Sequence, residues 1–396
     1  MTAPPPLQGL RVIELGQLIA GPFCAQLLAD FGAEVIKVEA PDRPDPARDW
    51  GAVKKDGHGL FWPIIARGKK SLTLNLRVEA GQAILKRLAE TADVLVENFR
   101  PGTLEKWNIG PDALHAINPR LVIVRVSGYG QTGPESSKAG YASVGEAKGG
   151  LRYLIGEPDR VPARAGVSLG DTMTGTFAAL GAMMALHARE RTGQGQVVDA
   201  AIYETVMAFM ESLIPEFALA GHTRERTGPI LSKVAPSSVY PCTDGMVIIG
   251  ANQDTLFGRL SQMCGADWAG DPKFATHDAR GENQTELDKL IGDWTAQRTM
   301  AEVISAAEAH GIPCGPVNTA ETMLQDAHIA AREAIIRVAH PELGEVPMQG
   351  VFPKLSDTPG RVSGTGPALG ADNGELLGVL GVTEAEQATL KEQGVI

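Results

Sequence analysis

Two strand-like runs flank a helical run near the start of the chain: LRVIEL at residues 10–15, GPFCAQLLADFG at 21–32 and AEVIKVE at 33–39. The outer runs are short, apolar and rich in valine and isoleucine, as strands are. The middle run has apolar residues at helical spacing and closes at Gly32, a residue type that commonly ends helices. Parallel strands need a crossover connection, usually a helix. This stretch therefore predicts an α/β fold.

The same alternation continues over the next ninety or so residues. We expect a helix over 78–91, a strand in DVLVENF at 93–99, a short helix near 111–117 and a strand in LVIVRVSGYG at 121–130. Strands that alternate with helices are typical of a parallel sheet with helical crossovers.

A long helix is expected at about 171–190. Its larger apolar residues recur every three to four positions: Met173, Phe177, Leu180 and Met184. His187 lies on the same stripe, and we interpret it as a packed helix histidine. The remaining positions are rich in alanine and glycine, which permits close backbone packing. VVDAAIY at 197–203 then predicts a further strand.

The second half of the chain predicts a smaller domain. Residues 221–243 have the composition of an extended linker, and MVIIGA at 246–251 is typical of a strand. Several helical patterns follow to about residue 330. We therefore expect a large domain over 1–220, a linker over 221–243 and a small domain over 244–330.

Composition excludes several classes of function. The 396 residues include 47 acidic and 36 basic ones, a net charge of −11, which argues against a general nucleic-acid binder. The first ten residues lack a signal-peptide pattern and the apolar stretches are too short to span a membrane, so we expect a cytoplasmic protein. The four cysteines have no metal-ligand spacing, so no metal site is expected.

A dinucleotide-binding fold is the first interpretation of a strand-helix-strand start, but its fingerprint is missing. The first strand-to-helix turn reads GQLIAGPF, with glycines at 16 and 21, which does not fit GxGxxG. A nicotinamide oxidoreductase is therefore disfavoured. The turn still brings backbone N–H groups to a helix N-terminus, where an anion is favoured.

Asp171 is the first candidate for chemistry. It lies in GVSLGDTMTGT, directly after a glycine and at the expected start of the long helix. An aspartate there is either an N-cap, which accepts a hydrogen bond from the first turn, or a nucleophile for covalent catalysis. Spacing alone favours the N-cap.

Seven motifs occur in the order and spacing of one known family: ELGQLIAGPF, GAEVIKVEAP, GKKSLTLNL, VENFRPG, SGYGQTGP, GVSLGDTMTG and RTGQGQVVDAAIYE. The chain resembles the class III CoA-transferases, strongly over 1–240 and more weakly to its end. The resemblance implies transfer of coenzyme A between carboxylic acids. It also implies a Rossmann-like large domain built from both chain ends, so that 331–396 would complete 1–220, and an interlocked homodimer.

Several apolar residues after the long helix fit such a dimer. We interpret them as core or dimer contacts rather than a substrate pocket: Tyr203, Met207, Phe209, Met210 and Phe217.

The family's nucleophilic aspartate matches Asp171. The resemblance implies that this carboxylate attacks the donor thioester to give an anhydride and free CoA thiolate. The thiolate then returns to the aspartyl carbonyl, and the acceptor acid attacks the resulting enzyme thioester. Coenzyme A is therefore expected as a substrate, with no permanently bound cofactor and no metal. Short, dicarboxylic acids are the expected acyl groups.

The family's CoA contacts match positions at or just beyond strand ends, where open α/β sheets bind ligands. These positions are Leu18, Ile19, Ala20, Leu74, Arg77, Asn98, Phe99 and Lys106, with Lys138 and Tyr141 further along. The cationic members would supply positive charge for the phosphates. One departure is Ala40, where the formate/oxalate branch has a basic residue.

Two other functions stay open. The racemase branch uses a histidine base in a motif like AGHD, but this chain reads AGYA with Tyr141, and tyrosine is a poor base at neutral pH. A catalytically silent acyl-CoA binding protein is disfavoured because Asp171 is retained. The segment TGPILSKVAPSS lacks the glycine run of the formate/oxalate branch, so that chemistry is not assigned.

A dicarboxylic substrate needs a cation for the carboxylate that does not react. Arg48 in RDW and Arg164 in PARAGVSLGD are the candidates near the expected site by motif, and we favour Arg48. Arginine suits this role because its planar fork holds a carboxylate with two hydrogen bonds.

Overall fold

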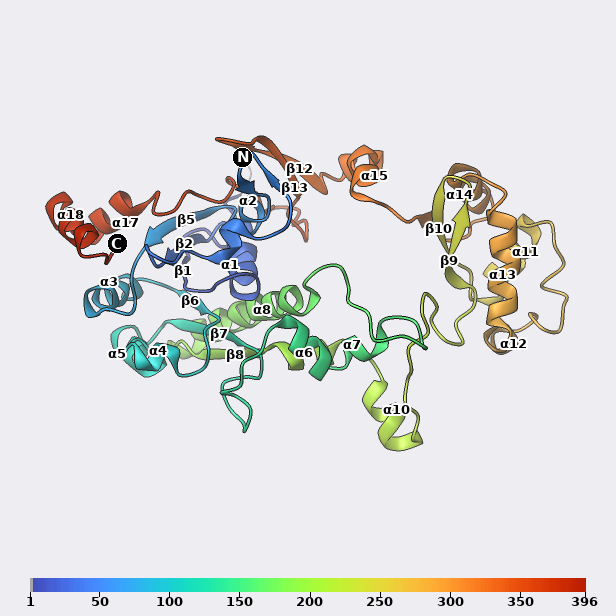
Figure 1. Cartoon of the computed structure of the whole chain (residues 1–396), viewed down its shortest axis with the longest axis horizontal. Coiled ribbons are helices and arrows are strands. Elements are labelled where there is room, and N and C mark those ends of the chain that lie inside the picture. Colours follow the sequence, from blue (N-terminus) through green and yellow to red (C-terminus); the bar gives the residue numbers. More distant parts are fainter. Residues whose placement is uncertain (1–2) are drawn as a thin grey trace. The chain divides into compact units, whose positions relative to one another are not determined.

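The computed structural model describes residues 3–396, which divide into two compact units (Figure 1). The first unit contains the chain up to Arg152 together with Ala165–Ala220 and Ala330–Ile396, and the second contains Tyr153–Arg164 and Gly221–Ile329. No helix among the described residues has the length and apolar character needed to cross a membrane.

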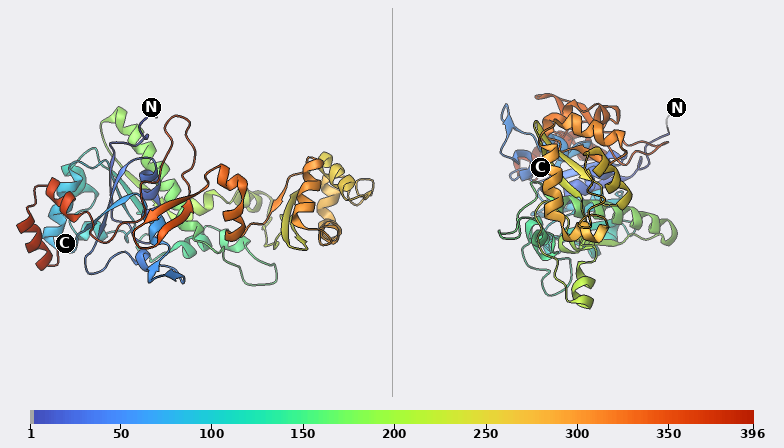
Figure 2. Two further views of the ribbon diagram at one scale, coloured as in Figure 1. Left: turned by 90° about the horizontal axis from the view of Figure 1, so that it is seen from above. Right: turned by 90° about the vertical axis from the view of Figure 1, so that its right-hand side faces the viewer.

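A six-stranded sheet forms the centre of the first unit (Figures 1 and 2). Its strands, in spatial order, are β5 (Lys69–Thr73), β2 (Glu34–Glu39), β1 (Arg11–Glu14), β6 (Val94–Glu97), β7 (Val122–Ser127) and β8 (Val197–Ala201). Every neighbouring pair is parallel. The expected α/β fold with a parallel sheet is confirmed. Because the chain builds outward from β1 on one side and then on the other, the order reverses between β1 and β6, the place where such sheets bind ligands.

Helices and short strands complete this unit. The longer helices are α1 (Ala20–Asp30), α3 (Glu79–Ala89), α5 (Pro111–Ile117), α6 (Ala142–Lys148), α8 (Leu169–Thr192), α9 (Ile202–Ala208), α10 (Leu213–Ala220), α17 (Asn373–Val379) and α18 (Glu384–Glu392). The shorter elements are β3 (Lys54–Lys55), β4 (His58–Gly59), α2 (Trp62–Ile65), α4 (Thr103–Lys106), β12 (Ile335–His340), β13 (Gly344–Gln349) and a single 3₁₀ turn at Pro46–Asp49. The boundary between the units falls within α7 (Leu151–Leu154) and within α16 (Ala327–Ala331).

Alternate residues of each strand enter two different cores, because successive side chains point to opposite faces of a sheet. Val12 of β1 packs with residues of α1 and α8 on one face. Ile13 packs on the other face with residues of α3, α5 and the C-terminal segment, including Leu376 and Leu377. The last part of the chain also binds the edge strand β5, since the Ser71 N–H donates to the Asp372 carboxylate at 2.7 Å.

The buried face of α8 differs from the one that the apolar stripe predicted. Small residues face the protein: Thr174, Gly175, Ala178, Ala179, Ala182 and Ala185. Phe177, Leu180 and Met184 are exposed, and Met184 retains 62% of its accessible surface. His187 is also exposed, so its interpretation as a packed histidine was wrong. The physical reason is the short distance between α8 and α1, which leaves room only for alanine and glycine.

The second unit has its own sheet and core. It comprises β9 (Ser237–Cys242), β10 (Gly245–Gly250), β11 (Cys314–Pro316), α11 (Asp254–Met263), α12 (His277–Glu282), α13 (Gln284–Thr295), α14 (Met300–Ala309) and α15 (Ala320–Gln325). Strand β9 lies inside the expected linker 221–243. Tyr240 and Ala235 are buried in the apolar core, which explains why this segment is ordered despite its polar and proline-rich composition.

Gly175 tests the close packing of α8 on α1. A Cβ atom there would lie 2.7 Å from the carbonyl oxygen of Ala20, so Gly175→Ala should lower the free energy of unfolding by about 1–3 kcal/mol. Gly378 in α17 is the matched control, because a Cβ there meets open space and alanine should add about 0.5–1 kcal/mol. Urea unfolding of both variants measures the difference, and equal stabilisation by both would contradict this packing.

Candidate active site

A strained turn follows β1 at the point where the strand order reverses. Leu18 has a φ of +63°, in the left-handed region that residues other than glycine rarely adopt. The two glycines of GQLIAGPF explain how the chain then enters α1. Added Cβ atoms at Gly16 and Gly21 would each meet the other glycine's Cα at 3.1–3.2 Å. The turn is therefore folded tightly against the start of the helix.

Three side chains from other parts of the sequence hold the polar groups of this turn. Asn98 accepts from the Gln17 N–H at 2.7 Å and donates to the Gln17 carbonyl at 2.8 Å. Asp45 accepts from the Leu18 N–H at 2.9 Å, and Lys37 donates to the Gly16 carbonyl. Strain of this kind persists only where the surroundings fix it, and it concentrates at functional sites.

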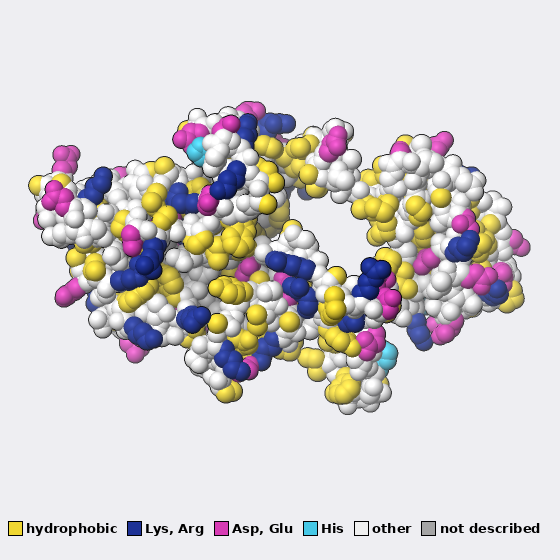
Figure 3. All heavy atoms as spheres, viewed as in Figure 1, with side chains coloured by type: hydrophobic (Ala, Val, Ile, Leu, Met, Phe, Trp, Pro, Cys, Tyr) yellow, Lys and Arg dark blue, Asp and Glu magenta, His cyan; other side chains and the backbone are white. Residues whose placement is uncertain are grey.

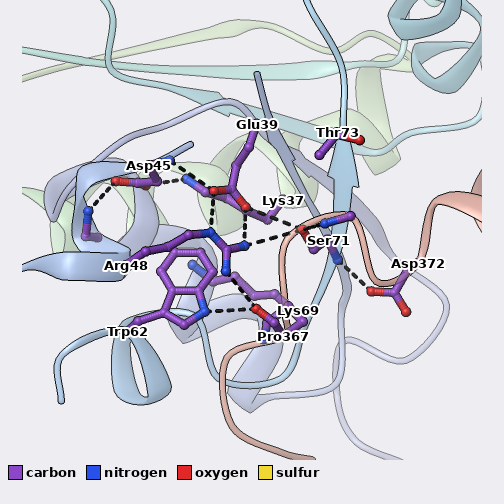
Figure 4. A network of polar contacts seen from close by, with 12 residues as sticks. Lys37, Glu39, Asp45, Arg48, Trp62, Lys69, Ser71, Thr73, Pro367 and Asp372 are labelled. Atoms are coloured by element: carbon purple, nitrogen blue, oxygen red, sulfur yellow. Dashed lines mark hydrogen bonds and ion pairs between the residues drawn. The ribbon is translucent and has the colours of Figure 1, made fainter. Parts of the chain in front are cut away.

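A buried network of charges contacts this turn, and Figure 4 shows its members Lys37, Asp45 and Lys69. Lys37 contacts Glu14 at 3.0 Å and Asp45 at 2.7 Å, and Lys69 contacts Glu14 at 2.7 Å. The side chains of these four residues are at most 1% exposed. Burying a charge costs several kcal/mol, so each must be paired.

The pKa values follow from burial and pairing. Burial by itself would lower the pKa of Lys37, but the neighbouring carboxylates, Glu14 first, raise it above its usual range. Burial would raise the pKa of Asp45, but Lys37 and two backbone N–H donors hold it below its usual range. Burial dominates at Lys69 and lowers its pKa despite Glu14. Lys37 and Asp45 therefore form the firmly charged pair.

Arg48 belongs to the same network. It binds Glu39 through two nitrogens, at 2.8 and 2.6 Å, and donates from the third to the Pro367 carbonyl at 3.0 Å. Its guanidinium also stacks 3.8 Å from the centre of the Trp62 ring. Each nitrogen of Arg48 thus has a protein partner, which leaves it poorly suited to the substrate carboxylate for which we favoured it. Arg164, the other candidate, is exposed and belongs to the second unit.

The predicted CoA-contacting residues of the first motifs lie at carboxyl ends of parallel strands. Leu18, Ile19 and Ala20 follow β1, Leu74 and Arg77 follow β5, and Asn98 and Phe99 follow β6, with Lys106 at the end of α4. Several of them are buried, with side chains inside the protein: Ile19, Ala20 and Leu74. A ligand can reach these three only through their backbone.

The more polar members of the predicted set differ in accessibility. Arg77 and Lys106 are exposed. Phe99 packs its ring edge-on to Trp107. Asn98 is half-buried, and both ends of its amide already serve the Gln17 backbone. Asn98 therefore shapes the turn in this structure.

Lys138 lies in the loop that follows β7, and Tyr141 lies at the end of that loop. Lys138 is exposed and contacts Glu135 at 2.6 Å. Lys148 of α6 contacts the same carboxylate, and these two lysines lower the pKa of Glu135 to about 2. Tyr141 is the exposed residue directly before α6. Among residues 3–396, no cluster of histidine, cysteine or acidic side chains could hold a metal ion.

Asp171 lies inside the first turn of α8. The N-cap position belongs to Ser168, so Asp171 is the third helical residue and is half-buried. The expectation that spacing favours an N-cap was therefore wrong. A helix N-terminus carries a partial positive charge, which stabilises an anion in its first turn.

A buried acidic residue lies beside this turn, and no motif in the sequence predicts it. Glu146 of α6 accepts from the Gly170 N–H at 3.1 Å with one oxygen and from Arg152 at 2.6 Å with the other. Its side chain is 4% exposed. Glu146 thus replaces the missing N-cap side chain of α8. Only a contact between residues 24 positions apart identifies it.

Leu18 tests whether the turn is held in its strained form. Leu18→Val should lower the free energy of unfolding by about 2 kcal/mol, because a β-branched residue fits a positive φ poorly. Leu18→Gly should change it by no more than about 1 kcal/mol. Ile19→Val is the control and should cost about 0.5–1.5 kcal/mol, since Ile19 has a negative φ. A Leu18→Val cost no larger than that of Ile19→Val, in urea unfolding, would contradict a rigid turn.

Comparison with known proteins confirms the resemblance seen in the motifs. The family model for CoA-transferase family III matches residues 7–373. The chain is 56% identical to succinyl-CoA–D-citramalate CoA-transferase of Chloroflexus aurantiacus, over 99% of this chain and 98% of the relative. It is 40% identical to the succinyl-CoA–L-malate CoA-transferase beta subunit of the same organism, again over 99% and 98%.

A solved structure agrees. The crystal structure of a CAIB/BAIF family protein from Brucella suis matches with a TM-score of 0.86 and 33% identity, over 96% of this chain and all of that one. From the family match and these relatives, the chain belongs to CoA-transferase family III.

Proposed function

We propose that this enzyme moves CoA between short dicarboxylic acids, with Asp171 as its covalent nucleophile. The observation that carries the proposal is the place of Asp171, half-buried in the first turn of a 24-residue helix, within a family match that spans the chain. The helix N-terminus would favour the carboxylate and the oxyanions that form beside it.

The first half of the reaction transfers CoA to the enzyme. An oxygen of Asp171 attacks the thioester carbonyl of the donor, the C–S bond breaks, and CoA leaves as a thiolate. The thiolate then attacks the aspartyl carbonyl of the resulting anhydride, and the donor acid leaves as a carboxylate. The product is a thioester between Asp171 and CoA.

The second half runs in reverse with the acceptor. Its carboxylate attacks the aspartyl thioester and expels the CoA thiolate, which then attacks the acceptor carbonyl of the new anhydride. Acyl-CoA leaves and the Asp171 carboxylate is regenerated. No electron is transferred and no proton is gained or lost overall, so the cycle needs a nucleophile and oxyanion stabilisation but no permanently bound cofactor.

We place CoA at the carboxyl ends of β1, β5 and β6. The strand order outward from β1 is that of Rossmann-like sheets, which bind nucleotides at the point of reversal. The exposed cations Arg77 and Lys106 would face the phosphates, and the strained turn would offer its backbone to the ligand. Lys138 and Tyr141 would contribute from the loop side.

The acyl groups are proposed from the relatives. Both named Chloroflexus enzymes carry a succinyl-CoA donor and a hydroxylated dicarboxylic acid in their names. We assign the same class of substrate to this chain. The four free cysteines fit a reducing compartment, so we place the reaction in the cytoplasm.

We also propose a homodimer, because several helices of the first unit carry large apolar side chains that are exposed; hydrophobic side chains also lie at the surface of the face drawn in Figure 3. The exposed residues lie on α8, α9 and α10: Phe177, Leu180, Met183, Met184, Met207, Ile214, Phe217 and Leu219, with Phe209 directly after α9. Large exposed apolar side chains that gather on neighbouring elements mark interaction sites. Most of the residues interpreted above as core or dimer contacts belong here, whereas Met210 is buried in the chain itself.

The nucleophile can be trapped. Hydroxylamine added during turnover should convert the activated Asp171 to a hydroxamate. Trypsin then releases residues 165–189, in which Asp171 is the single acidic side chain, so a mass shift of that peptide locates the label. Asp171→Ala should abolish both the label and transfer while CoA still binds.

Glu190→Ala is the matched control, since it removes an exposed carboxylate from the other end of the same helix and should transfer CoA normally. A panel of acceptor acids with succinyl-CoA, analysed by mass spectrometry, identifies the CoA products. Transfer by Asp171→Ala at the wild-type rate would exclude the covalent mechanism.

The dimer has its own test. Met184→Asp should reduce the yield of the two-chain species, because a charge placed in an apolar interface must be desolvated without a partner. Val379→Asp is the control, an equally drastic change at an exposed valine on α17. Sedimentation measures both, and the wild type should remain two-chain at nanomolar concentration. A folded wild-type monomer under those conditions would refute the proposal.

A further inference from the structure

A dicarboxylate substrate needs a protein cation for its second carboxylate, and neither arginine predicted for that role is well placed to supply it. One carboxyl group reacts at Asp171, and the other must keep a negative charge inside the site. An unpaired charge in a desolvated site costs several kcal/mol, so a protein cation should face it. Arg48 is held at each nitrogen by Glu39 and Pro367, and its environment is complete without a ligand.

Arg152 is connected to the start of α8 by a short series of contacts. Its Nη2 donates to one oxygen of Glu146 at 2.6 Å, and the other oxygen of Glu146 accepts from the Gly170 N–H at 3.1 Å. The guanidinium therefore lies within about 8 Å of the residue next to Asp171. A four-carbon diacid places its two carboxyl carbons roughly 4 Å apart. With a hydrogen-bond length added at each end, such a molecule spans a distance comparable with the one between the guanidinium and the start of α8.

Glu146 binds only part of the Arg152 guanidinium. The bond to Glu146 involves one nitrogen, whereas Arg48 gives two nitrogens to Glu39 and the third to a carbonyl. The Arg152 side chain is 22% exposed and that of Glu146 is 4% exposed. The buried carboxylate thus fixes the direction of the guanidinium, while part of its edge stays accessible. Such a prearranged arginine binds a carboxylate with little loss of side-chain entropy.

We infer that Arg152 binds the non-reacting carboxylate of the acyl group, and that Glu146 is the positioning residue that orients it. This inference rests on the dicarboxylate substrates proposed above and names the group that recognises them. Arg152 acts on each acyl group that passes through the site, donor and acceptor alike, since both carry a second carboxylate.

Two exchange reactions test the inference on a matched pair of substrates. The enzyme is incubated with succinyl-CoA and labelled succinate, and separately with butyryl-CoA and labelled butyrate, which differs by having a methyl group in place of the second carboxylate. The ratio of kcat/KM for the two exchanges measures recognition of that carboxylate. Arg152→Ala should lower the ratio about 100-fold, mainly by loss of succinate exchange. Arg152→Lys should lower it less, because charge remains without the planar fork.

A double variant separates recognition from structure. Arg152→Ala leaves the buried Glu146 carboxylate without its cation, which by itself can disturb the start of α8. Arg152→Met with Glu146→Gln removes both charges, while the amide oxygen still accepts from the Gly170 N–H. The inference requires the same loss in the ratio for the double variant. Arg160→Ala, at an exposed arginine in the following loop, should leave the ratio unchanged.

The outcomes are distinct. An unchanged ratio in both Arg152 variants, or a ratio restored by the double variant, would overturn the role of Arg152 while wild-type succinate exchange still supports the proposed function. A wild type that exchanges no succinate would instead overturn the dicarboxylate assignment itself.

Discussion

The buried ion pair between Lys37 and Asp45 fixes the geometry on which the ligand-binding end of the sheet depends. Asp45 holds the Leu18 N–H and Lys37 holds the Gly16 carbonyl, so the pair binds both sides of the turn that ends β1. A left-handed leucine costs about 1–2 kcal/mol, which two bonds to charged groups exceed. Because this turn lies where the strand order reverses, a ligand meets a backbone that is already arranged.

Much of the fold can be predicted from the sequence, because elements that are buried have recognisable runs or spacings of apolar residues. Strands β1, β2, β6 and β7 are short apolar runs. The first three were expected within one or two residues of their observed bounds, and β7 ends three residues before its expected end. Strand β9 was missed because serine, proline and cysteine hide its alternation, and only packing of Tyr240 reveals it. The large residues of α8 predicted the wrong inward face, because apolar spacing does not show which side of a helix can approach its neighbour closely, and here only the small residues fit against α1.

The site is less predictable than the fold, because a motif identifies residue types but not the side chains and backbone groups that each residue contacts. Asn98 is expected to contact CoA, and the motif does not reveal that its amide also binds the Gln17 backbone. Arg48 is expected to bind a substrate carboxylate, and the motif does not reveal that Glu39, nine positions away, binds it too. Whether a polar side chain is available depends on contacts between distant segments. Glu146 and Arg152 belong to no motif that we recognised in the sequence, and their contacts with each other and with Gly170, the residue before Asp171, exist only once α6 and α8 are packed.

The proposed chemistry requires that anions meet in one place. The nucleophile is a carboxylate, CoA carries phosphates, and each acid substrate is charged, in a protein whose net charge is −11. Coulomb repulsion between such groups can be overcome only by local positive potential. Helix α8 supplies part of it, because Asp171 lies in its own first turn, close to the positive end of the helix. The small residues of α8 are therefore a functional constraint as much as a packing one: a bulkier face would move Asp171, together with its helix end, away from the start of α1.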